Sequence, residues 1–411
     1  MQKEVAVIEI KDKHFRLIIG YLYDEKIDIL YEKRYVLTNE NNDGDIFDVN
    51  SLANDLKVIT SISDQKQRLK INITEVVLVL PSFGLEVYNT QKSTNTISND
   101  GRIDKIDIAN ALSLVKKEKI PNQNNVITDI IPNVFITDDS RNFSEPPLGE
   151  ISTNILIDAN VYTLPNNLVS KLKEAITNAG LKIKRTVISP IGVDCLLKAK
   201  KFKFDTYILV EYDQTNTVLS FIGKHTLFQS NFFKIGGEHI TYDIATHFSI
   251  PFEKAEEIKQ TYGLDLRDTL FNTPILEVLG PDGFKRKYTK DDLNPVIANS
   301  FKSWQGYFSN SLNTLLKDYE ELIEKIPLVF IGDSSLVNGF KNFIHKNYPN
   351  NPVEFINYNA VGAEKPSNIN CLGAIQYVSV YQGTLEEEVK VKIADIQRTN
   401  EEKYREDEDL L

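Results

Sequence analysis

The sequence has 411 residues, of which 41% are hydrophobic and 10% aromatic, which is enough to fill the cores of two domains and excludes a disordered chain. Its net charge of −11 at pH 7 excludes general binding to nucleic acid, because an acidic surface repels phosphate backbones. The N-terminus does not resemble a signal peptide, and no stretch approaches the ~18 apolar residues of a membrane span, so we expect a cytoplasmic protein.

The first elements along the chain form a triple of strands, and the same device recurs later. Strands are predicted at residues 5–10, 15–23 and 26–36, and again at 207–211, 218–222 and 225–234. Each triple has short polar turns, as in a β-meander. The first strands of the two triples end at Glu9 and Glu211, half the chain apart. This repetition predicts two related domains that face each other.

Helices and buried strands alternate after each triple. Helical spacing is found at 49–69, 107–118, 168–179, 193–200, 240–248, 252–262, 291–325, 336–346 and 369–381. Strands are predicted at 75–80, 126–135, 181–187, 327–331 and 353–356, and those at 75–80 and 327–331 are expected to be buried. Such alternation is typical of a mainly parallel α/β architecture.

The segment 83–160 departs from this alternation, because it contains a polar stretch at 91–101 and a Pro-Pro turn. We therefore interpret it as an inserted subdomain. The predicted domains are 1–82 plus 161–203, the insertion 83–160, a second domain 204–385 with an outer subdomain 249–325, and a charged tail 386–411.

Several short motifs occur in a fixed order along the chain. They are IPNVF at 131–135, PPLG at 146–149, IGGEHITYDIA at 235–245, AEEIKQTYG at 255–263, YTKDDL at 288–293 and EKP at 364–366. Their order resembles FtsA, the bacterial cell-division member of the actin-like ATPases. The resemblance implies an actin-like (ribonuclease-H-type) α/β fold of two domains with a small inserted subdomain.

The resemblance also implies a nucleotide site, at turns where glycine lets the backbone approach phosphate. In this sequence the first two turns carry Lys11 and Asp213 where glycine is expected, and the third is Gly332-Asp333-Ser334. The extra carboxylates oppose phosphate binding unless Mg²⁺ neutralises them. We therefore expect ATP and Mg²⁺ to bind weakly or not at all, and no efficient hydrolysis.

The candidate nucleotide-binding residues are Glu9, Lys11, Glu211, Asp213, Gly236, Gly237, Glu256, Lys259, Gly332, Asp333 and Ser334. Two of the interpretations stay open. Glu9 and Glu211 could hold a hydrated Mg²⁺ or simply face solvent, and Glu256 and Lys259 could contact a nucleoside or form an exposed helical salt bridge. No catalytic residue and no dedicated metal site are assigned. Cys195 and Cys371 lack CxxC partners and are expected to be buried thiols.

In FtsA-like proteins the outer subdomain of the second domain holds the C-terminal tail of FtsZ. The densest basic run of this chain falls there, and the candidate partner-binding residues are Lys285, Arg286, Lys287, Lys290 and Lys302. On an acidic chain such a run favours an acidic or carboxylate-ended peptide, although an ordinary solvated hairpin has the same pattern. Ser300 stands where the family often has arginine.

Three functions remain in competition. The first is an FtsA-like scaffold that recruits FtsZ and associates head to tail into filaments. The second is a working Mg-ATP-dependent ATPase, and the third is a pilus-assembly-type adaptor that binds a peptide from a membrane partner. The acidic tail lacks a basic amphipathic helix, so we expect a partner to supply the contact with the membrane at the division site.

Overall fold

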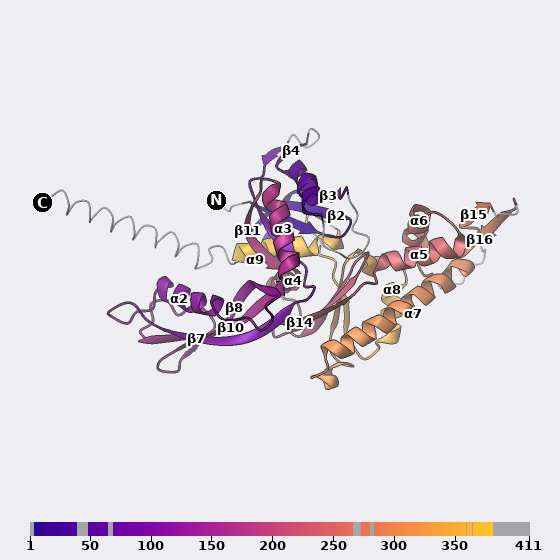
Figure 1. Cartoon of the computed structure of the whole chain (residues 1–411). Helices are drawn as coiled ribbons and strands as arrows, with labels where there is room; N and C mark the ends of the chain where they lie inside the picture. The colour runs from indigo at the N-terminus through magenta and orange to yellow at the C-terminus, as the bar shows by residue number, and fades with distance from the viewer. Residues whose placement is uncertain are drawn as a thin grey trace. The chain divides into compact units, whose positions relative to one another are not determined.

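The computed structural model describes residues 4–38, 48–64, 69–265, 273–279, 283–358, 360–363 and 365–380. The chain divides into two compact units (Figure 1). Of the described residues, those within 4–85 and 170–377 form the main unit, and 86–169 with 378–380 form the inserted unit. The predicted tail 386–411 and Glu364 of the EKP motif lie outside the described residues.

The first sheet of the main unit has the strand order β11-β6-β1-β2-β3. Its strands are β1 (Val5–Ile10), β2 (His14–Tyr23), β3 (Lys26–Val36), β6 (Glu75–Leu80) and β11 (Lys182–Ile188). The first three form the predicted antiparallel meander, while β6 runs parallel to both β1 and β11. Strand β6 is almost wholly apolar and buried, and it lies between β11 and β1.

The second sheet repeats this topology in the order β14-β13-β12-β17-β18. Its strands are β12 (Tyr207–Tyr212), β13 (Thr217–Gly223), β14 (Thr226–Phe233), β17 (Leu328–Ile331) and β18 (Val353–Phe355). The antiparallel meander is again followed by two parallel strands. The predicted duplication of a three-stranded device and the α/β fold are therefore confirmed.

Helices and a hairpin complete the main unit. They are α1 (Val49–Leu56), η1 (Lys57–Ile59), α4 (Ser189–Ala199), α5 (Gly237–Phe248), α6 (Phe252–Tyr262), β15 (Leu276–Leu279), β16 (Lys285–Tyr288), α7 (Lys290–Leu315), η2 (Glu320–Leu322), η3 (Asp333–Leu336), α8 (Phe340–Asn347), η4 (Pro366–Asn368) and α9 (Ile369–Val380). Helix α3 (Asn166–Asn178) contains the boundary between the units. Helices α4 and α9 cross at Gly192 and Gly373, where a side chain on either would meet the other's backbone.

The core of the second half is rich in aromatic rings packed between α7 and the second sheet. Trp304 stacks on Phe308 with ring centroids 4.8 Å apart and also contacts Phe340. Its indole Nε1 donates a hydrogen bond to Thr217 Oγ1 at 3.0 Å. Trp304 and Phe308 are fully buried, whereas Tyr307, on the same helix, is 52% exposed.

Two predictions about helices were wrong. The helix predicted at 291–325 ends at Leu315, because Leu316 is fully buried and the partly buried Leu322 and Ile323 turn the chain back onto the core. The helical spacing at 49–69 continues only to residue 59, and a hairpin follows, formed by β4 (Ser61–Asp64) and β5 (Leu69–Asn72). Local apolar spacing does not distinguish a short strand from a helical turn.

The inserted unit is a sheet with the order β7-β10-β8-β9 and one helix. The elements are β7 (Glu86–Asn95), α2 (Lys105–Lys116), β8 (Asn125–Thr137), β9 (Asn142–Phe143) and β10 (Asn154–Pro165). The polar stretch predicted from residue 91 begins inside β7, and the predicted boundary at 160 falls inside β10. Strand β10 alternates buried apolar residues with half-buried ones along its first half, whereas β7 is mostly polar, so neither resembles the buried apolar strands of the main unit.

Candidate functional site

The candidate site lies in the main unit, where the turns that follow β1 and β12 meet. Glu9 is the last but one residue of β1, and Glu211 occupies the same place in β12. Each strand is flanked on one side by a parallel strand, β6 and β17 respectively. The carboxyl ends of parallel strands are where ligands bind in α/β sheets, so this placement agrees with the site predicted from the sequence.

The ammonium group of Lys11 stands at the centre of this site. Its Nζ lies 3.0 Å from Glu9 Oε1, 2.5 Å from Glu211 Oε1 and 2.7 Å from Asp213 Oδ2. Asn370, at the start of α9, donates from Nδ2 to Glu9 Oε1 and Glu211 Oε1, each at 2.6 Å. The two candidate Mg²⁺ ligands therefore bind a lysine and an amide of the chain itself.

A second cation completes the cluster. Arg16, from β2, donates to Glu9 Oε2 at 2.9 Å and also to the carbonyl oxygen of Ser367. Glu9 and Arg16 are each only 3% exposed. Sequence reasoning missed Arg16 and Asn370, because neither belongs to a motif and Asn370 lies at the far end of the chain.

Charge explains how the cluster titrates. Three carboxylates (Glu9, Glu211, Asp213) face two cations (Lys11, Arg16), so one negative charge is uncompensated when all are ionised. Burial raises the pKa of Glu211 to about 7, against the opposing effect of Lys11. Burial also acts to raise the pKa of Asp213, but Lys11 outweighs it and holds that pKa below its ordinary value. Burial acts to lower the pKa of Lys11, and the charges of Asp213, Glu211 and Glu9 raise it well above the usual range.

Further side chains join the two turns directly. Thr215 Oγ1 donates to Asp12 Oδ2 at 2.5 Å, and Lys13 Nζ forms an ion pair of 2.9 Å with Glu238 on α5. Each turn is also closed by its own backbone, because the amide of Lys11 donates to the His14 carbonyl and that of Asp213 to the Asn216 carbonyl. The two turns thus contact each other at the place where the family resemblance predicts that phosphates lie between them.

Backbone donors at the start of α5 are already used. The amides of Gly237 and Glu238 donate to the carbonyl oxygens of Asp213 and Gln214, at 2.9 and 2.8 Å. Such amides otherwise favour anion binding at a helix N-terminus. Ser334 Oγ also donates to the Asp213 carbonyl at 2.8 Å.

The glycines at this place pack against the chain itself. A Cβ on Gly237 would lie 2.2 Å from Ser334 Oγ, and one on Gly236 would lie 2.3 Å from the Gln214 carbonyl. Gly332 has φ +92°, and a Cβ on it would lie 2.4 Å from the Tyr212 carbonyl oxygen. Asp333, the next residue, lines the edge of the site. The glycines thus allow close packing of the protein on itself.

The predicted nucleoside contacts form a salt bridge. Lys259 Nζ lies 2.6 Å from Glu256 Oε2 and donates to the Gly237 carbonyl at 3.1 Å and Thr241 Oγ1 at 2.9 Å. The Lys259 side chain is only 5% exposed, so the interpretation of an exposed surface pair is wrong for the lysine. Burial lowers the pKa of Lys259, and the ion pair with Glu256 opposes that effect.

The space left between the turns is small. A cavity of about 30 Å³ remains, lined by Lys11, Asp12, Lys13, His14, Arg16, Asp213, Gln214, Thr215, Asn216, Asp333 and Ser367. That volume suits roughly one water molecule, whereas small-molecule sites usually offer about 300–1,000 Å³. The arrangement therefore does not fit Mg-ATP. Within the described part of the chain, no group of three or more His, Cys, Asp or Glu side chains is arranged to hold a metal ion.

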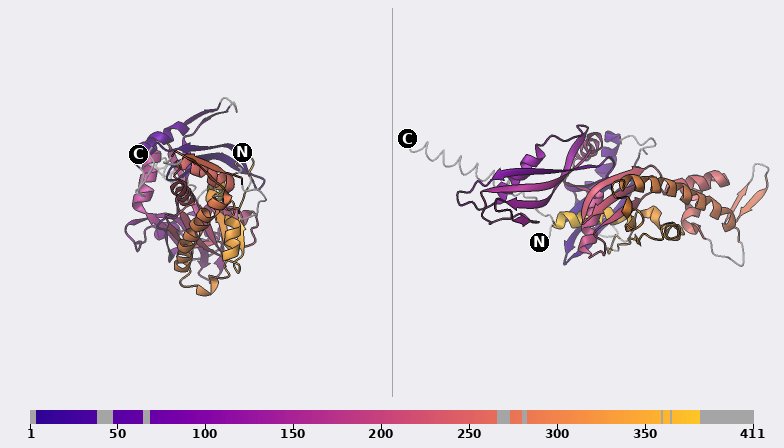
Figure 2. Two further views of the ribbon diagram at one scale, coloured as in Figure 1. Left: turned by 90° about the vertical axis from the view of Figure 1, so that its right-hand side faces the viewer. Right: turned by 90° about the horizontal axis from the view of Figure 1, so that it is seen from below.

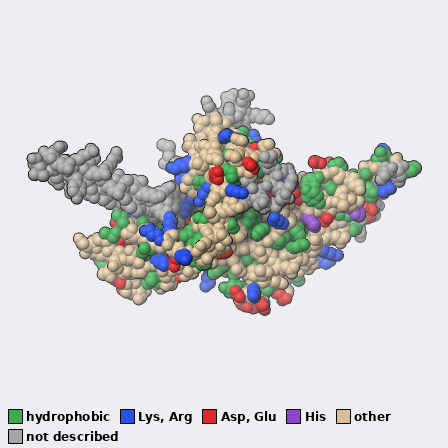
Figure 3. Space-filling model, viewed as in Figure 1, with side chains coloured by type: hydrophobic (Ala, Val, Ile, Leu, Met, Phe, Trp, Pro, Cys, Tyr) green, Lys and Arg blue, Asp and Glu red, His purple; other side chains and the backbone are tan. Residues whose placement is uncertain are grey.

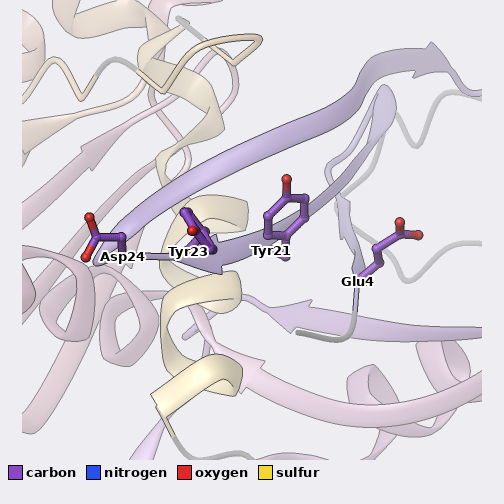
Figure 4. A pocket seen from close by; sticks show the side chains of 4 residues that line it. All are labelled: Glu4, Tyr21, Tyr23 and Asp24. Carbon is purple, nitrogen blue, oxygen red and sulfur yellow. The ribbon is translucent and has the colours of Figure 1, made fainter. Parts of the chain in front are cut away.

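An open hollow elsewhere on the first sheet was not predicted. It is lined by Glu4, Tyr21, Tyr23 and Asp24, whose side chains follow one another along the ends of β1 and β2 (Figure 4). Two carboxylates and two phenols supply no cation for a phosphate. We assign no nucleotide to this hollow.

The basic candidates separate into distinct places. Lys285, Arg286 and Lys287 form β16 of the β15–β16 hairpin, which extends beyond α5 and α6 (Figure 2), and Lys287 Nζ lies 3.2 Å from Glu277. Lys290 forms an ion pair of 2.8 Å with the buried Asp265. Lys302 is exposed on α7, roughly 18 Å further along the helix axis at 1.5 Å per residue.

Ser300, which takes the place of a frequent family arginine, is buried. Its hydroxyl donates to Asp243 Oδ2 at 2.5 Å and contacts the Val296 carbonyl at 3.0 Å. Among the residues that the structure describes, no helix is both long and apolar enough to cross a membrane.

Comparisons with known proteins agree with the sequence motifs. Residues 214–373 match the family model of the cell division protein FtsA. The FtsA of Streptococcus pneumoniae serotype 2 is 25% identical over 222 residues, which cover 54% of this chain and 48% of that protein. The FtsA of Buchnera aphidicola subsp. Baizongia pistaciae is 22% identical over 328 residues, covering 78% and 75% of the two chains. The chain thus spans about half the length of some of the curated relatives it matches.

Solved structures show the fold alone at these low identities. A PilM–PilN type IV pilus biogenesis complex aligns with a TM-score of 0.55 at 15% identity, covering 91% of this chain and 98% of that chain. MreB5 of Spiroplasma citri bound to ADP aligns with a TM-score of 0.52 at 11% identity, covering 94% and 98%. The predicted actin-like fold and the resemblance to FtsA are both confirmed, and the matches support an FtsA-type cell-division protein.

Proposed function

We propose that this chain, an FtsA-type protein of the actin-like superfamily, is a scaffold in bacterial cell division that recruits FtsZ through its C-terminal tail. The observation that carries the proposal is the FtsA match over residues 214–373, a segment that contains the basic hairpin. We further propose that the chain associates head to tail, that ATP binding is weak or lost, and that it works at the inner face of the membrane through a partner.

The hairpin has the chemistry of a peptide-binding surface. Lys285 and Lys287 lie 3.8 and 3.2 Å from the same carboxylate on the opposite strand, Glu277, and Arg286 stands between them opposite Val278. Leu279 and Phe284, at the ends of the two strands, are 68% and 74% exposed. Figure 3 shows basic and hydrophobic side chains together over this hairpin. A peptide with acidic and apolar side chains would pair with both kinds of group.

The test is fluorescence polarisation with a labelled FtsZ C-terminal peptide. We expect binding that weakens at least tenfold when Lys285, Arg286 and Lys287 are all replaced by alanine, because charge-assisted contacts are lost. Lys254→Ala is the matched control, since Lys254 is also an exposed lysine in an ion pair but lies on α6. Lys302→Ala, in a separate arm, tests whether the exposed helix cation contributes.

Two outcomes contradict the proposal. One is the absence of measurable binding at about 100 µM peptide, a concentration that detects even complexes worth only about 5.5 kcal/mol. The other is equal binding by the triple variant and the wild type. Lys290→Ala is unsuitable here, because it would leave the buried Asp265 without its ion pair.

Two alternative functions have their own tests. The fold shared with the PilM–PilN complex suggests a pilus-assembly-type adaptor as an alternative function. Tight binding of a peptide from a membrane partner, without binding of the FtsZ tail, would favour this alternative. An active ATPase would release phosphate in a single turnover, and Glu9→Ala or Glu211→Ala would abolish that release if the predicted site performs it. Sedimentation of the full chain with and without ATP tests the proposed filaments.

A further inference from the structure

We infer that Lys11 is the internal cation of the cleft between the β1–β2 turn and the β12–β13 turn. Its ammonium group joins the half of the main unit that contains the first sheet to the half that contains the second, and holds them closed without a nucleotide. The inference rests on the proposed loss of ATP binding. It assigns a function to the residue that replaces the expected glycine, and it does not depend on the identity of the peptide partner.

The contacts of the ammonium group come from both halves. Glu9 belongs to the first sheet, whereas Glu211 and Asp213 belong to the strand and turn of the second. An ammonium group has three N–H groups, and three carboxylate oxygens lie within 3.0 Å of Nζ. Two of these contacts, to Glu211 and Asp213, are hydrogen bonds, and the third, to Glu9, is an ion pair, so the contacts of Lys11 hold the two turns together.

The neighbouring contacts support the same closure. Asn370 connects Glu9 of the first half with Glu211 of the second, and it is only 3% exposed. The Asp12–Thr215 hydrogen bond crosses the cleft in the same way. Because these groups are partly or wholly buried, their attraction is screened less by solvent than that of surface pairs.

A nucleotide would have to displace this arrangement. When Glu211 is ionised, the cluster carries one uncompensated negative charge, which repels an approaching triphosphate. The amides of Gly237 and Glu238 could otherwise offset this repulsion by binding phosphate, but they already donate to carbonyl oxygens of the β12–β13 turn. Closure by Lys11 and closure around a phosphate are thus mutually exclusive in this cleft.

The experiment is hydrogen–deuterium exchange of the full chain, read on both sides of the cleft. One readout is the β1–β2 turn, where the Lys11 amide donates to the His14 carbonyl, and the other is Gly237 and Glu238, whose amides donate to the β12–β13 turn. Both readouts lie beside contacts that cross the cleft, so faster exchange on the two sides together measures its opening. We expect Lys11→Met to accelerate their exchange by about tenfold or more, since losing one partner of a buried ion pair is strongly destabilising. Exchange in α2 of the inserted unit should not change. Lys254→Met, which breaks the exposed pair with Glu257, should behave like the wild type.

A second variant guards against misfolding of the first. Lys11→Met with Asp213→Asn removes one uncompensated charge and should recover part of the lost protection. Unchanged exchange in Lys11→Met, or no recovery in the double variant, overturns the inference. In a further arm, Mg-ATP is added to the wild-type protein. Slower exchange of the same amides would show that nucleotide closes the cleft and would also contradict the proposed loss of ATP binding. Failure of the FtsZ peptide to bind, by contrast, leaves all these readouts unaffected.

Discussion

Replacing Glu211 by glutamine should stabilise the protein at pH 8, although Glu211 forms an ion pair with Lys11. Counting ion pairs predicts the opposite. The reason is that Glu211 is 8% exposed and shares Lys11 with two other carboxylates. The cost of ionising this buried group exceeds what its share of the lysine returns, so its pKa is raised. Glutamine reproduces the shape of the protonated form without that cost.

The magnitude follows from the pKa of about 7, against an ordinary value of 4.5. Between these values the folded chain holds a proton that the unfolded chain has released, so stability falls as pH rises through this window. At 1.36 kcal/mol per pKa unit, the full effect is about 3 kcal/mol. The lowered pKa of Asp213 and the raised pKa of Lys11 act outside the window, below pH 3.8 and above pH 10.5 respectively.

The assay is urea unfolding at pH 5, 6, 7 and 8, followed by the fluorescence of Trp304, the single tryptophan of the chain. The free energy of unfolding of Glu211→Gln should equal that of the wild type near pH 5 and exceed it by up to about 3 kcal/mol at pH 8. Asp213→Asn is the matched control and should be destabilising at pH 8, because the pKa of Asp213 is lowered. A Glu211→Gln variant that is less stable than the wild type at pH 8 would refute the reasoning.

Three further substitutions test the packing around the site and in the inserted unit. Trp304→Ala should lower the free energy of unfolding by about 3–5 kcal/mol, because it empties a fully buried aromatic position and leaves Thr217 without its donor, and urea melts followed by circular dichroism will measure this. Gly332→Ala should cost about 1–3 kcal/mol, since φ is +92° and the new Cβ would lie 2.4 Å from the Tyr212 carbonyl; a thermal melt like that of the wild type would contradict this. Asp104→Ala removes the capping box of α2 and should cost about 1 kcal/mol, visible as faster amide exchange confined to that helix.

Much of the fold could be predicted from local patterns. Both strand triples were located because the period of two, the polar turns and the buried parallel strands are properties of short segments. Strand β7 was missed because it is mostly polar and becomes a strand by pairing with β10. The hairpin after α1 was missed because each of its strands has only four residues. The end of α7 depended on where Leu316 packs, which local spacing does not reveal.

At the candidate site the sequence by itself showed that glycine is replaced in the two phosphate turns by Lys11 and Asp213, and that the predicted ATP site is therefore altered. It did not show what those side chains do. Only the tertiary structure brings Glu9 and Glu211 to one ammonium group and places the Asn370 amide, 361 residues from Glu9, against both carboxylates. The physical reason is that the charges around a lysine decide whether it binds phosphate or pairs with carboxylates of its own chain. Those charges are brought together by packing between distant segments rather than by the neighbours of the lysine in the chain.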